Sequence, residues 1–108
     1  MHALKTLIFA AALVIGTASA AAPAMAAEFT IVLNPLKFGE IPAGLHVGDT
    51  NIWENDDSFR HSATARDKSF DVDLPPGAKV PMVLNAAGNI DFFCKFHPGM
   101  RGTLVITQ

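Results

Sequence analysis

The sequence predicts an all-β domain, an antiparallel Greek-key sandwich or barrel of about seven short strands. Two observations carry this prediction. After residue 26, apolar and polar side chains alternate with a period of two in one short segment after another, and turn-forming residues separate these segments. In addition, no stretch keeps a helical period over ten residues. Short strands with frequent turns typically pack as sandwiches or small barrels.

Three strands are expected in the first half of the domain. The segment EFTIVL, residues 28–33, alternates cleanly and ends at an Asn-Pro pair. The segment VGDTNIWEN, residues 47–55, begins with a Gly-Asp turn signal and is followed by a polar loop. In FRHSATA, residues 59–65, the imidazole of His61 has the same parity as Phe59, so we expect both side chains to point inward.

Four strands are expected in the second half. The segment SFDVDL, residues 69–74, alternates apolar and acidic side chains and ends at a Pro-Pro-Gly turn. The segment VPMVLNA, residues 80–86, contains Pro81, which confines this strand to the edge of a sheet. The last two are NIDFFC, residues 89–94, and GTLVITQ, residues 102–108.

Residues 1–26 predict a cleaved signal peptide. A weakly basic start precedes the apolar run 7–15, and small residues follow with A-x-A cleavage patterns at 18–20 and 24–26. A membrane anchor is the alternative interpretation, but the apolar run is short for a membrane span. A cut after residue 26 leaves the mature domain 27–108, and export predicts a periplasmic location.

The charge balance excludes some partners. Without Lys5, the mature domain carries seven basic and ten acidic side chains, with no basic run and no basic amphipathic helix. We therefore expect neither nucleic acid as a partner nor stable membrane insertion. We also expect the protein to be a monomer.

The stretch DFFCKFHPGMRGTL holds the most specific signal. Cys94, the only cysteine, lies three residues before His97, which lies three residues before Met100. The intervening Pro98-Gly99 argues against an uninterrupted helix and favours a type II turn, which brings its first and fourth residues together. The parity of the preceding strand turns the thiol inward. Three side chains can therefore converge from one loop.

Thiolate, imidazole and thioether form a soft to borderline set of ligands, which suits copper. A trigonal plane of two histidines and a cysteine with a weak axial methionine is typical of electron-transfer copper sites. The second imidazole is expected from inward-facing His61, because His46 lies among polar and turn residues and His2 lies in the signal. The alternative is a small buried cysteine and a core histidine with no metal.

The segment FFCKFHPGMRGTLVI resembles the copper loop of the cupredoxins, or type 1 blue copper proteins, and most closely the amicyanin type. Upstream, GDTNIWENDDSFRHSATA resembles the strand and loop that lead to the first histidine ligand, so the likeness spans roughly residues 47–106. The resemblance implies His61 and His97 as imidazole ligands, Cys94 as the thiolate and Met100 as the axial thioether of one type 1 copper per chain.

Ser62 departs from the family pattern, since asparagine often follows the first histidine ligand. The resemblance further implies a one-electron carrier, not an enzyme, that cycles copper between Cu(II) and Cu(I). Its partners would be redox proteins, a dehydrogenase as donor and a c-type cytochrome or an oxidase as acceptor. A periplasmic copper-binding or delivery protein that uses the same ligands is the alternative, and a metal-free interaction module is a third possibility.

Overall fold

The computed structural model describes residues 3, 10–13, 16 and 25–108. The expected signal peptide, residues 1–26, lies largely outside these described residues and stays a prediction. In the described part of the chain, no helix is long and apolar enough to cross a membrane.

Eight strands form the domain, and all seven expected strands are among them. The unexpected one is β2, a pair of residues too short to leave a periodic pattern. The strands are β1 (Glu28–Leu33), β2 (Leu45–His46), β3 (Thr50–Asn55), β4 (His61–Ala65), β5 (Asp71–Leu74), β6 (Lys79–Val83), β7 (Gly88–Phe93) and β8 (Arg101–Thr107).

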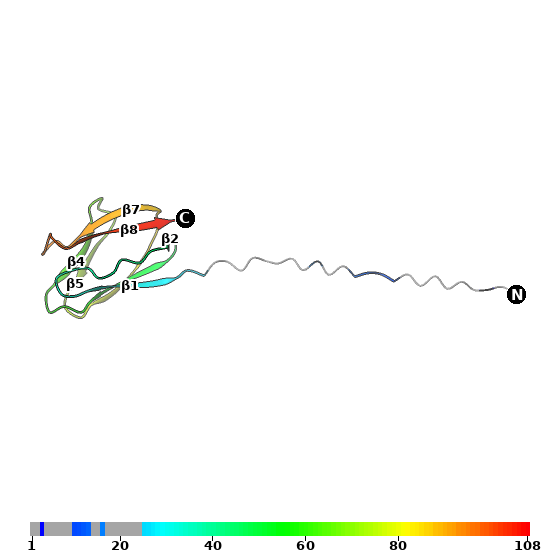
Figure 1. The fold of residues 1–108 in the computed structure, drawn as a ribbon, viewed down its shortest axis with the longest axis horizontal. Helices are drawn as coiled ribbons and strands as arrows, with labels where there is room; N and C mark the ends of the chain where they lie inside the picture. Colours follow the sequence, from blue (N-terminus) through cyan, green and yellow to red (C-terminus); the bar gives the residue numbers. More distant parts are fainter. Residues whose placement is uncertain (1–2, 4–9, 14–15, 17–24) are drawn as a thin grey trace.

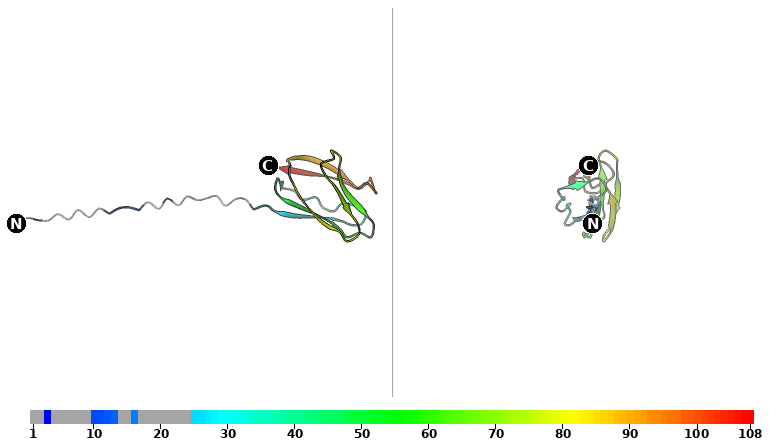
Figure 2. Two further views of the ribbon diagram at one scale, coloured as in Figure 1. Left: turned by 180° about the vertical axis from the view of Figure 1, so that it is seen from behind. Right: turned by 90° about the vertical axis from the view of Figure 1, so that its right-hand side faces the viewer.

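The strands form two sheets that face each other as a sandwich (Figures 1 and 2). One sheet has the order β1-β3-β6 and the other β2-β8-β7-β4-β5. The all-β sandwich is thereby confirmed. Pairing is not antiparallel throughout, however, because β1 runs parallel to β3 and β2 runs parallel to β8. Each of these pairs joins strands linked by a long excursion of the chain, and such a connection permits parallel pairing.

An aromatic cluster fills the space between the sheets. Trp53 on β3 and Phe92 on β7 are fully buried, and their ring centroids lie 5.1 Å apart in an edge-to-face arrangement. Phe38, from the loop after β1, contacts both rings. The ring of Phe92 also covers Gly102 on β8, where an added Cβ would lie 2.6 Å from the Cζ atom of Phe92. The core thus reaches β7 and β8, the two strands that flank residues 94–100.

Strand β6 lies at the edge of the three-stranded sheet, as Pro81 predicted. Proline lacks the N–H that a second neighbouring strand would need, and β6 pairs only with β3. By contrast, the inward position expected for Phe59 is wrong. Residues 57–59 bend ahead of β4, which begins only at His61, and the ring of Phe59 is 51% exposed.

The connection between β7 and β8 lies at the end of the sandwich opposite the C-terminus (Figure 1). These two strands pair as an antiparallel hairpin from Gly88 to Ile106, and residues 94–100 form its loop. Strand β4 begins at the same end, because Thr64 and Ala65 pair with the last residues of β7. The hairpin loop and the start of β4 are therefore brought together.

Candidate metal centre

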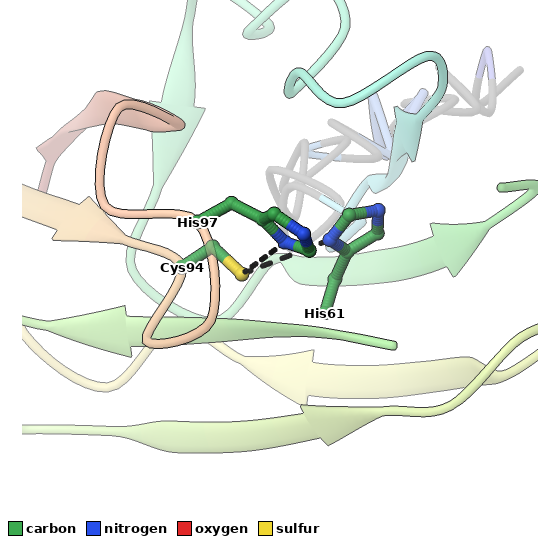
Figure 3. A group of neighbouring side chains, drawn as sticks. All are labelled: His61, Cys94 and His97. Carbon is green, nitrogen blue, oxygen red and sulfur yellow. Dashed lines mark hydrogen bonds between the residues drawn. The ribbon is translucent and has the colours of Figure 1, made fainter. Parts of the chain in front are cut away.

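Three of the four expected ligands meet at this end of the sandwich (Figure 3). His61 is the first residue of β4, Cys94 directly follows β7, and His97 lies in the hairpin loop. One ligand atom from each residue lies within 4.8 Å of the other two. Strand pairing between β4 and β7 thus joins residues that are 33 positions apart in the sequence.

The separations fit a trigonal metal site. Sγ of Cys94 lies 3.7 Å from Nδ1 of His61 and 3.9 Å from Nδ1 of His97. Metal bonds of about 2.0 Å to imidazole and about 2.3 Å to thiolate, spread at about 120°, place nitrogen about 3.7 Å from sulfur. The three donors therefore surround a space that one copper ion fits.

Burial differs between the two imidazoles. His61 and Cys94 are fully buried, as parity predicted. His97 is half-buried, and its ring centroid lies 5.0 Å from that of His61 and 5.9 Å from that of the exposed Phe59. His97 is thus the imidazole that connects the interior of the site with the surface.

The hairpin loop closes by backbone hydrogen bonds. The N–H of Met100 donates to the carbonyl of His97 at 2.8 Å, and the N–H of Cys94 donates to the carbonyl of Met100 at 3.0 Å. The expected turn over residues 97–100 is present, but its type II geometry is wrong. That type needs a positive φ at Gly99, which is not among the described residues with positive φ. Proline at the second position is equally compatible with a type I turn.

Met100 is 4% exposed and lies between this turn and the start of β8. Its backbone is tied to both Cys94 and His97. Met100 is therefore a buried residue whose backbone is joined to two of the three clustered residues, and its role as the fourth ligand stays a prediction.

Ser62 connects β4 to the hairpin loop. Its backbone N–H donates to Sγ of Cys94 at 3.3 Å, and its hydroxyl accepts from the backbone N–H of Lys95 at 2.9 Å. Its hydroxyl also lies 2.9 Å from that of Thr64, which donates to Asp71, and Asp71 in turn accepts from the Lys95 ammonium. These four residues, called the Ser62 ring below, close a circuit of hydrogen bonds that includes the backbone N–H of Lys95. Ser62 thus joins the two segments that carry the expected ligands.

Asp57 orients His61 and was missed by sequence reasoning. Its Oδ2 atom lies 3.1 Å from Nε2 of His61, and its side chain is only 7% exposed. The backbone N–H of Leu36, above all, and the His61 imidazole hold the pKa of this carboxyl below its ordinary value. An ionised carboxylate accepts the Nε2 proton, which leaves Nδ1 free as a ligand atom. The available signal was an acidic residue four positions before a histidine.

The other two histidines do not join the site. His46 is exposed, and its Nδ1 atom lies 3.9 Å from Asp49 beside β2. The expectation that His46 is not a ligand agrees with its absence from the cluster of His61, Cys94 and His97. His2 lies outside the described residues.

Comparison with known proteins identifies the family. The chain matches the model of the cupredoxin-like domain over residues 6–106. No curated protein matches the sequence. The chain therefore belongs to the cupredoxin-like domain family, and its donor cluster identifies copper as its cofactor.

Solved structures share the fold. Amicyanin from Paracoccus versutus is 24% identical over 79% of this chain and 84% of its own, with a TM-score of 0.63. A purple cupredoxin from Nitrosopumilus maritimus is 24% identical over 71% of this chain and 97% of its own, with a TM-score of 0.58. The copper-containing nitrite reductase from Thermus scotoductus is 22% identical over 75% of this chain but only 22% of its own, with a TM-score of 0.68. These likenesses establish the fold. Family, fold and donor cluster together support a copper electron carrier.

Proposed function

We propose that this protein is a periplasmic one-electron carrier with one type 1 copper per chain, held by His61, Cys94, His97 and Met100. The observation that carries the proposal is the convergence of two imidazole nitrogens and one thiol sulfur within 4.8 Å. We further propose that residues 1–26 are a signal peptide and that residues 27–108 are the working domain.

Copper bound there supplies one-electron redox chemistry. The protein's part is to hold the donors in one geometry. Asp57 orients the buried imidazole of His61, and Sγ of Cys94 accepts a hydrogen bond from the backbone N–H of Ser62. Because His61 and Ser62 lie on a paired strand and Cys94 closes the hairpin loop, the donors have little freedom to rearrange when the charge of the site changes.

The surface around His97 is suited to electron exchange. Phe59 and Phe96 are 51% and 48% exposed beside this loop, and Arg60 stacks on the ring of Phe96. Such an apolar rim fits the small, transient interfaces of redox encounters. By family resemblance, the partners would be a dehydrogenase as donor and a c-type cytochrome or an oxidase as acceptor, met by a monomeric carrier.

Catalysis is not part of the proposal. A catalytic metal site keeps an open position for substrate, whereas four protein ligands would fill this one. A copper delivery protein would use the same residues but release its ion readily. The rate at which a Cu(I) chelator removes the ion separates these two functions, since a carrier should lose it slowly.

The decisive experiment adds Cu(II) to the copper-free protein and records its visible and EPR spectra. We expect one copper per chain and an intense thiolate-to-copper band that Cys94→Ser abolishes. His61→Ala and His46→Ala provide a matched pair of variants. The loss of the expected ligand His61 should remove the type 1 spectrum, whereas the loss of the exposed His46 should preserve it. An unchanged spectrum in Cys94→Ser or His61→Ala would disprove the ligand assignment.

A further inference from the structure

The start of the domain is bound to a buried carboxylate. The backbone N–H of Ala27 donates to Oδ1 of Asp49 at 2.8 Å, and the other oxygen accepts from the N–H of His46 at 2.8 Å. The carbonyl of Ala27 accepts from the N–H of Thr50 at 3.0 Å, one step before β1 begins. Asp49 is only 5% exposed. A full negative charge is therefore held against the nitrogen of Ala27.

That nitrogen changes its chemistry if the signal peptide is removed after Ala26. Hydrolysis of the Ala26–Ala27 bond adds one water, so that Ala26 leaves with a carboxylate and Ala27 keeps an amine. The amine takes up a proton at neutral pH and carries three N–H groups and a positive charge. Before cleavage, the same atom is an uncharged amide with a single N–H.

We propose that processing after Ala26 creates an ion pair between the new α-ammonium of Ala27 and the carboxylate of Asp49, which anchors the start of β1. The inference depends on the proposed signal peptide and not on the copper site. It assigns Asp49 a role in the mature protein that the precursor cannot use.

The surroundings favour this pair. The N–H groups of Ala27 and His46 hold the pKa of Asp49 below its ordinary value, so the carboxylate is charged at neutral pH. The open pocket beside Ala27 is bordered by Gly44 and Gly48, which carry no side chains, and has room for the added protons. Met25, just before the scissile bond, is 94% exposed and accessible to a peptidase.

The alternative cut after Ala20 would not form the pair. Six further residues, 21–26, would separate the new amine from Ala27, whose nitrogen would remain an amide. A segment of that length can place its end about 20 Å away. The position of the cut therefore decides whether Asp49 receives a charged partner.

The first test is the mass of the exported protein, which should match residues 27–108. The second is the pKa of its α-amine, measured in the copper-free protein by NMR or by the pH dependence of amine labelling. We expect the pKa of this amine to lie at least one unit above the ordinary range of about 7.7–8.0, which means that the proton is bound at least tenfold more tightly. In Asp49→Asn, the pKa should fall within the ordinary range.

Other charges near this amine must be separated from Asp49. Nδ1 of His46 lies 3.9 Å from Oδ2 of Asp49. Glu28 follows Ala27 in the chain, and Gln108 borders the pocket. A carboxylate on either of these two residues would raise the pKa of the amine, as Asp49 does. The Asp49→Asn variant keeps all three groups, so it isolates the contribution of Asp49.

Acetylation of the Ala27 amine is the matched control if Asp49→Asn fails to fold, because it restores the neutral amide of the precursor. If folding raises the pKa of the Ala27 amine, the protonated amine stabilises the folded protein. This stabilisation is complete below the pKa of the amine in the unfolded chain, about 8, and is lost as the pH rises through its pKa in the folded protein. The free amine should therefore raise the melting temperature relative to the acetylated form at pH 7, and the difference should vanish by about pH 10.5. A chain starting at residue 21, or an ordinary α-amine pKa in the wild type, would overturn the proposal.

Discussion

The backbone N–H of Ser62 donates to Sγ of Cys94, with a nitrogen-to-sulfur distance of 3.3 Å, although the residues are 32 positions apart in the chain. A hydrogen bond to a thiolate withdraws charge from the sulfur and is one means by which a protein tunes a copper site. Because the donor belongs to the backbone, only a proline at position 62 would remove it directly. The Ser62 ring controls it indirectly by fixing β4 against the hairpin loop.

Ser62→Ala should therefore destabilise the copper-free protein. The change leaves the Lys95 N–H without its acceptor, and such a loss costs about 1–3 kcal/mol. Urea unfolding measures the effect, with Ser58→Ala as the control because that residue is exposed and outside the ring. Equal stability of the two variants would mean that the ring contributes nothing.

Asp57→Ala should weaken copper binding about 10- to 100-fold, as expected when the partner of a metal-binding histidine is lost. Asp57→Asn should cost less, because its amide oxygen can still accept the His61 Nε2 proton. Competition with a copper chelator measures both affinities. Asp56→Ala removes the same charge from an exposed neighbour and should leave the affinity unchanged; a similar loss there would point to a general charge effect.

Met100→Leu should keep a coloured site and raise its reduction potential. The thioether of an axial ligand stabilises Cu(II) more than Cu(I), so its loss favours the reduced state. Each tenfold change in the relative affinities of the two states corresponds to about 59 mV, which voltammetry resolves. Complete loss of copper, or a lower potential, would argue against the axial position.

Gly102→Ala and Gly99→Ala form a matched pair. At Gly102, the added Cβ would lie 2.6 Å from the ring of Phe92, and such overpacking costs about 1–3 kcal/mol. At Gly99, nothing lies within 4 Å and φ is not positive, so alanine should be neutral or stabilise by about 0.4–1 kcal/mol. Thermal unfolding compares the variants. Strong destabilisation by Gly99→Ala would instead favour the type II turn.

Local patterns predicted much of this molecule. Alternation correctly indicated the inward side chains of β1, β5 and β7 because strand geometry relates parity directly to face. The hairpin loop could also be predicted from the sequence, since it holds three of the expected ligands and a Pro-Gly turn within seven residues. The burial of His61 agrees with that of Ala63 and Ala65, which have the same parity on β4, although Phe59 does not follow it.

Features that depend on distant contacts were not predictable in this way. The parallel pairing of β1 with β3 leaves no trace in either segment. The inward position predicted for Phe59 was wrong because residues 57–59 form a bend, and side chains alternate between the two faces only within the strand that begins at His61. Asp57 reads as part of a polar loop, and only the fold places its carboxylate against His61 and the N–H of Leu36.

The edge strands bear on solubility. On β6, Pro81 offers no N–H to an incoming strand, and Lys79 adds a charge on the same edge. On β5, at the edge of the other sheet, the exposed Asp71 and Asp73 are ion-paired with Lys95 and Arg60. Edges of this kind resist strand addition between copies, the first step toward aggregation. We therefore expect strand addition between copies of the protein to be disfavoured at the β5 and β6 edges.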